Sequence, residues 1–65
     1  MKQFYIIKEE QEKYKVFSLF DNFSPIYYDY MYNAIELCRM RLNKELQNDK
    51  LKIIHLPFTK IWIVL

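Results

Sequence analysis

The sequence contains no glycine, one cysteine, one histidine and two prolines among its 65 residues. Without glycine, the glycine-dependent loops that bind phosphate are excluded, and flexible linkers are not expected. The single cysteine, Cys38, excludes an internal disulfide, and with His55 alone it cannot supply the four ligands of a structural zinc site. We therefore expect no metal and no cofactor. A chain this short is marginally stable, so we expect oligomerisation or a partner to stabilise it.

Long apolar runs are also missing. The longest, residues 61–65, is far shorter than the roughly 18 residues that span a bilayer, and the first residues are too polar for a signal peptide. Together with the free Cys38, this predicts a cytoplasmic location and no membrane partner. The net charge of +2 implies neither strong attraction to nucleic acid nor imitation of it. The abundance of residues with AT-rich codons suggests a gene from a low-GC genome or from a mobile element such as a phage.

Apolar and aromatic residues are abundant, at 52% and 18% of the chain. Such a composition predicts a folded chain, which we expect to form one domain over residues 1–65. Residues 4–7 and 13–20 favour strands and predict a hairpin, whose charged loop lacks glycine and should be four or five residues long with a type I turn. Residues 50–56 and 60–65 predict a second hairpin turning at Pro57. A single strand bent at Pro57 is the alternative.

Between the hairpins, the sequence predicts one long amphipathic helix. Ser24 is suited to the N-cap and Pro25 to the first helical position. Apolar residues then recur at helical spacing from residue 26 to about 47, and residues 47–49 fit the end of the helix. The expected fold is therefore α+β, with the order ββαββ, a four-stranded and mainly antiparallel sheet, and the helix packed on one face.

Both faces of that expected sheet are apolar, and one helix about 10 Å wide cannot cover four strands spaced about 4.8 Å apart. Alternation groups Ile6 and Val16 on the inner face. It places Tyr5, Phe17 and Trp62 on the outer face, where the lysines Lys15, Lys52 and Lys60 also fall. Residues 61–65 would aggregate if exposed, so we expect them to be a paired structural strand.

These surfaces predict a function in binding rather than catalysis. Tyr5, Phe17 and Trp62 are candidate partner-binding residues, and Tyr30, Leu37 and Arg41 form a second candidate patch on the helix. We expect a non-enzymatic inhibitor or regulator that binds another protein and that forms a homo-oligomer through the outer face. The alternative is a module for single-stranded nucleic acid, in which the outer aromatics stack on bases and Lys15, Lys52 and Lys60 contact phosphates.

The sequence offers one candidate catalytic pair, Cys38 and His55. Cys38 lies within the apolar stripe of the expected helix, where a small thiol is ordinary packing. No third group that could orient His55 is evident, so we expect no catalytic residue.

Overall fold

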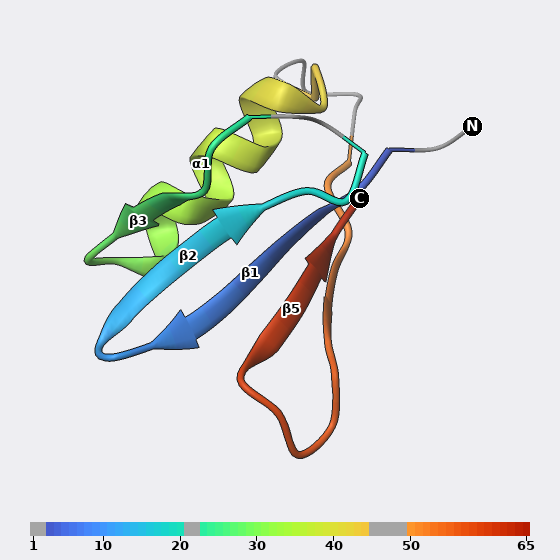
Figure 1. The fold of residues 1–65 in the computed structure, drawn as a ribbon. Coiled ribbons are helices and arrows are strands. Elements are labelled where there is room, and N and C mark those ends of the chain that lie inside the picture. The colour runs from blue at the N-terminus through green and yellow to red at the C-terminus, as the bar shows by residue number, and fades with distance from the viewer. Residues whose placement is uncertain (1–2, 21–22, 45–49) are drawn as a thin grey trace.

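The computed structural model describes residues 3–20, 23–44 and 50–65, and it contains a five-stranded antiparallel sheet with one helix (Figure 1). The elements, in chain order, are β1 (Tyr5–Glu10), β2 (Lys13–Phe17), β3 (Ile26–Tyr28), α1 (Met31–Arg41), β4 (Ile53–His55) and β5 (Ile61–Val64). Across the sheet the strands follow the order β3-β2-β1-β5-β4. The α+β class is confirmed, whereas the expected ββαββ order with four strands lacks β3.

Strand β3 occupies the segment where the sequence predicted the first turn of the helix. Its residues Ile26, Tyr27 and Tyr28 have β-favouring side chains, and they pair with β2 through Tyr14↔Tyr28 and Lys15↔Tyr27. Pairing with a formed strand satisfies their backbone groups, and this outweighs the local helix-start signal of Ser24 and Pro25.

Helix α1 is therefore short, at 11 residues, and not the long helix that was expected. Its N-cap is Tyr30, which makes no side-chain capping bond. At its other end Asn43 adopts a left-handed conformation with φ of 56°, and the Lys44 N–H donates to the Arg39 carbonyl at 3.0 Å. This is the closing geometry that asparagine tolerates best after glycine. The helix was expected to continue to residue 47, but residues 45–49 lie outside the described part of the chain.

The first hairpin is confirmed, but its loop is shorter than expected. Glu10 pairs with Lys13, so only Gln11 and Glu12 connect β1 to β2. Both have positive φ, 52° and 64°, as a type I′ turn requires. The twist of such a turn matches the twist of the strands, and that match prevails here although neither residue is the usual Asn or Gly.

The second hairpin is also confirmed, since β4 pairs with β5, and the alternative of one bent strand is wrong. Its turn runs from Leu56 to Thr59, closed by a bond of 3.2 Å from the Thr59 N–H to the Leu56 carbonyl, with Pro57 at the second position. Phe58 follows with φ of 63°. A positive φ at the third position is typical of a type II turn, where glycine is the usual residue.

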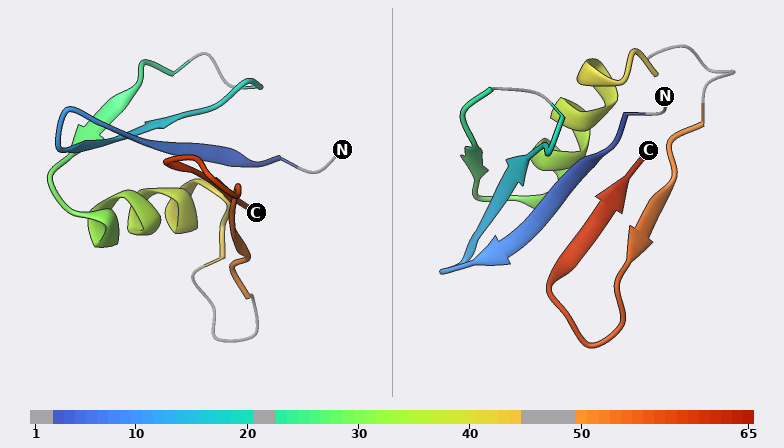
Figure 2. Two further views of the ribbon diagram at one scale, coloured as in Figure 1. Left: turned by 90° about the horizontal axis from the view of Figure 1, so that it is seen from below. Right: turned by 45° about the vertical axis from the view of Figure 1, so that its right-hand side comes forward.

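The core lies between α1 and one face of the sheet (Figure 2). Ala34 and Cys38 of the helix pack with strand side chains, and the buried cluster comprises Tyr5, Ile7, Val16, Val64, Ala34 and Cys38. The expected grouping of Ile6 with Val16 on the inner face is therefore wrong, because Tyr5 and Ile7 are the residues of β1 that face the helix.

Strand β5 is structural, as the sequence predicted for residues 61–65. It lies between β1 and β4, and pairs with both through Tyr5↔Val64 and Ile53↔Val64. Val64 is fully buried. The apolar strand β5 is thus paired with a neighbouring strand on both sides.

Candidate interaction surface

Residues directly opposite one another in neighbouring antiparallel strands point to the same side of a sheet, so the register defines a second face turned away from α1. Ile6 is opposite both Phe17 and Ile63, and Ile63 is opposite Ile54. We call this side the open face; its strand residues are Ile6, Lys8, Glu10, Lys13, Lys15, Phe17, Tyr27, Ile54, Ile61 and Ile63.

The centre of the open face is a continuous apolar row. Phe17, Ile6, Ile63 and Ile54 follow one another across β2, β1, β5 and β4. The middle residues shelter one another, so that Ile6 is nearly buried, but Ile54 at the edge remains 46% exposed. No helix packs over this row in the described part of the chain, because α1 lies on the other side. The row is therefore an apolar strip without a helix over it, in which Ile6 is sheltered and Ile54 is the most exposed member.

Next to this strip the open face is charged, and lysine predominates. Glu10 is the only carboxylate among its strand residues, and its carboxylate oxygens lie 3.7 Å from the Lys8 ammonium and 3.8 Å from that of Lys15. The Lys15 ammonium also lies 5.1 Å from the centre of the Phe17 ring. Lys13 pairs with Asp29, which precedes the helix. Lys8 and Lys15 thus share a single acidic partner, which leaves positive charge beside the apolar row.

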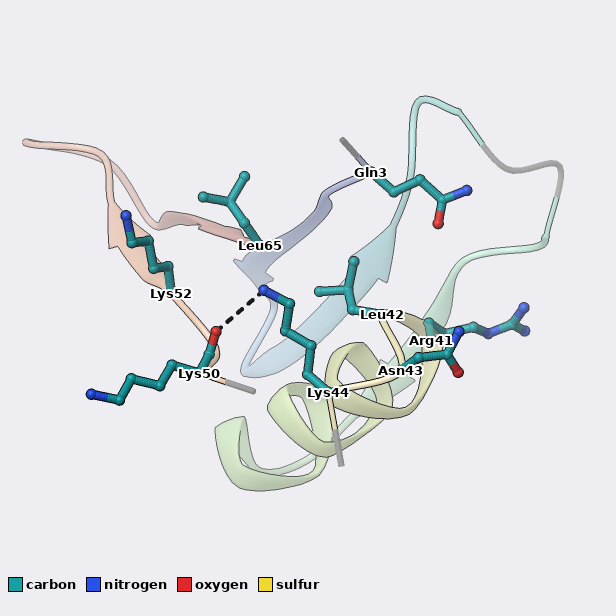
Figure 3. A pocket seen from close by; sticks show the side chains of 8 residues that line it. All are labelled: Gln3, Arg41, Leu42, Asn43, Lys44, Lys50, Lys52 and Leu65. Carbon is teal, nitrogen blue, oxygen red and sulfur yellow. Dashed lines mark hydrogen bonds between the residues drawn. The ribbon is translucent and has the colours of Figure 1, made fainter. Parts of the chain in front are cut away.

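A basic hollow lies at one end of the sheet, beside the end of α1 (Figure 3). It has a volume of about 470 Å³ and is lined by Gln3, Arg41, Leu42, Asn43, Lys44, Lys50, Lys52 and Leu65. Lys52 and Leu65 exchange both backbone hydrogen bonds, at 2.8 Å, which continues the β4–β5 pairing and places them on the open face. The Lys44 ammonium donates to the Lys50 carbonyl at 3.2 Å, whereas the amines of Lys50 and Lys52 point outward. No described residue of the hollow carries a carboxylate side chain.

Two of the aromatic residues predicted to lie on the outer face lie on the helix side instead. Tyr5 is 1% exposed and contacts Phe23, with ring centres 5.7 Å apart. Trp62 is half-buried between Tyr14, at 6.3 Å, and His55, which stacks on it at 5.0 Å. Their placement on the outer face was wrong. The two-residue loop places Ile7 opposite Val16 on the helix side, and Trp62 lies opposite Ile7 on the same side.

The other predicted surface residues are divided between the two sides. Phe17 and Lys15 lie on the open face, as expected, and Lys52 lies at its end. Lys60 directly precedes Ile61, so alternation places its side chain on the face opposite to that of Ile61. Its backbone carbonyl accepts from the Glu9 N–H of β1 at 2.9 Å. The predicted set of lysines is thus split by the sheet.

The second predicted patch on the helix is not a single surface. Tyr30 is 71% exposed, but Leu37 is partly buried against the core cluster. Arg41 is exposed, and its guanidinium lies 4.6 Å from the centre of the Phe23 ring. Leu37 therefore has a packing role, and only Tyr30 and Arg41 are available at the surface.

Cys38 is fully buried, as its position in the apolar stripe predicted. Desolvation raises the pKa of its thiol from 9.0 to about 12, so the reactive thiolate is suppressed at neutral pH. His55 is exposed, and its Nε2 lies 2.6 Å from the Thr59 carbonyl oxygen in the β4–β5 turn. These environments give no support to a catalytic pair.

Two features were missed in the sequence. Ile6 was assigned to the inner face and Phe17 to the outer, so the row that joins them was not recognised, and a correct loop length was needed to place both on one face. Phe58 was read merely as part of a turn, but it is fully exposed, with a relative exposure of 105%. Its place directly after Pro57 was the available signal, because the third position of such a turn often has positive φ.

No family model, curated protein or solved structure matches the chain. Within residues 3–20, 23–44 and 50–65, no group of metal-binding side chains is found, and no helix is long and apolar enough to cross a membrane.

Proposed function

We propose that this chain is a small non-enzymatic protein-binding module that inhibits or regulates a larger enzyme or complex, and that it docks through the open face. The apolar row of Phe17, Ile6, Ile63 and Ile54 carries this proposal. Contiguous apolar strips bordered by charged side chains are typical of interaction sites, because the exposure of apolar surface to water is unfavourable in free energy. Covering one exposed aliphatic side chain stabilises a complex by about 1–2 kcal/mol.

The sheet has more surface that the helix does not cover than the sequence suggested. The sheet has five strands and the helix only 11 residues, whose strand contacts are concentrated on β2 and β3. The open face has no helix at all over it among the described residues. Both a second copy of the chain and a different protein would supply the missing cover.

The nucleic-acid alternative is less well supported. Stacking on bases requires exposed aromatic rings beside the basic groups. Tyr5 and Trp62 lie on the helix side, and although Phe17 and Tyr27 lie beside Lys15, the row across β1, β5 and β4 is aliphatic. Isoleucine side chains offer no stacking surface, so a protein is the better occupant.

Site-specific photo-cross-linking in the cells that naturally express the chain tests this proposal. A photoreactive phenylalanine analogue is placed at position 54 or, as a matched control, at position 53. Ile54 and Ile53 are adjacent on β4 and 46% and 43% exposed, but they lie on opposite faces. We expect a discrete protein adduct from position 54 and none from position 53. Equal labelling at both positions, or no protein adduct at position 54, would contradict the proposal.

A further inference from the structure

We infer that the occupant of the open face is a different protein, whose docking surface has an apolar centre bordered by carboxylates. This inference rests on the proposed function and names the chemistry of the partner. It is carried by two observations that lie next to one another in the sheet: the apolar row, and the lysine excess beside it.

The apolar row requires an apolar counterpart. Ile6 and Ile63 occupy the two central strands, β1 and β5, and Ile54 extends the row to the edge strand β4. Phosphate or sugar groups placed over these side chains would lose water without gaining apolar contacts. The centre of the complementary surface must therefore consist of aliphatic or aromatic side chains.

The charges beside the row require an acidic counterpart. Among the residues that the structure describes, Glu10 is the one acidic neighbour of Lys8 and Lys15 on the open face. At the other end, Lys52 is a further lysine of the open face. It borders the basic hollow, which Lys50 also lines, whereas Arg41 and Lys44 line that hollow from the end of α1. Carboxylates around an apolar centre would pair with the lysines and increase the association rate.

A second copy of the chain fits this arrangement poorly. Two open faces packed together would double the excess of lysine over glutamate, and the apolar rows would come together only at the cost of crowding ammonium groups. Asp29 offers no compensation, because it already pairs with Lys13. Salt would screen this repulsion, so a homodimer through the open face should form more readily as ionic strength rises. Binding to an acidic partner should show the opposite trend.

Two synthetic amphipathic helical peptides serve as probes. They share one leucine face, and the positions that flank it are glutamate in one peptide and lysine in the other. Binding is measured by anisotropy of the labelled peptide and by backbone amide shifts of the full chain in NMR spectra. We expect the glutamate peptide to bind at least about tenfold more tightly than the lysine peptide. The largest shifts should fall on Ile6, Phe17 and Ile63. Affinity should drop several-fold between about 50 and about 300 mM salt.

Matched variants separate the two observations. Ile54→Ser should weaken the glutamate peptide at least about fivefold, whereas Ile53→Ser, with nearly the same exposure on the other face, should not. Lys52→Glu should weaken the same peptide, whereas Lys60→Glu, which makes the same charge change off the open face, should have little effect.

The outcomes distinguish this inference from the function on which it rests. Equal binding of the two peptides, or binding of neither, overturns the acidic partner. A dimer detected by sedimentation at low salt and removed by Ile54→Ser also overturns it, but leaves the open face as a protein-binding surface. A labelled single-stranded oligonucleotide that shifts Ile6 and Ile63 would overturn both.

Discussion

The turn between β4 and β5 holds an aromatic residue in a conformation that costs free energy, and replacing it should stabilise the protein. Phe58 has φ of 63° and a relative exposure of 105%, so its ring gains nothing from burial in this chain. A left-handed conformation costs a residue with a Cβ roughly 1–2 kcal/mol. Glycine avoids that cost but loses about 0.5–1 kcal/mol more conformational entropy on folding. Phe58→Gly should therefore raise the free energy of unfolding by about 0.5–1 kcal/mol.

The expected gain can be measured by thermal unfolding, because a domain of this size shifts its Tm by about 4–8 °C per kcal/mol. Urea titration followed by the fluorescence of Trp62, which is half-buried on the adjacent strand, gives an independent value. Phe58→Ala is the control, since it removes the ring but keeps the Cβ, and it should change the stability by less than about 0.5 kcal/mol. Equal stabilities of the Gly and Ala variants would refute the reasoning, as would a lower Tm for Phe58→Gly.

Three further predictions concern the rest of the fold. Glu12→Gly should stabilise the protein by up to about 1 kcal/mol relative to Glu12→Ala in urea unfolding, because Glu12 has φ of 64°; no difference would contradict the type I′ turn. Val64→Ala should destabilise by about 2 kcal/mol, because Val64 is fully buried, whereas Leu19→Ala at an exposed site should not; similar losses would be inconsistent with this core. The unfolded chain releases the Cys38 proton above about pH 9, whereas the folded chain holds it to about pH 12, so the free energy of unfolding should fall as the pH rises between these values. In Cys38→Ala, compared at about pH 8 and about pH 10, that part of the decline should be missing. Identical slopes for the two proteins would contradict a buried thiol.

The two hairpins could be predicted because their signals are local. Strand-favouring residues flank a charged loop in the first, and Pro57 marks the turn in the second. The helix boundaries could not be predicted, because Ser24 and Pro25 form a good local start signal. The decision for β3 depends on a pairing partner, Tyr14, which a local window does not contain.

The kind of candidate site could be predicted, but not all of its residues. An uncovered apolar face follows from the number of apolar strand residues, whichever face is covered. The identity of that face depends on the parity of one loop. Grouping Ile6 with Val16 requires an odd number of loop residues, whereas the two-residue loop places Ile6 opposite Phe17. Phe17 was therefore assigned correctly, and Tyr5 and Trp62 were not.

The pairing of β1 with β5 also determines the order in which the molecule can assemble. Tyr5 and Val64 are neighbours in the sheet although nearly the whole sequence separates them, so that ladder must await the closure of a very long loop. The β1–β2 hairpin can form early, because only Gln11 and Glu12 join its strands. Until β5 docks, such an intermediate has an unpaired strand edge beside Ile6 and Ile7, which makes it more prone to aggregate than the finished protein.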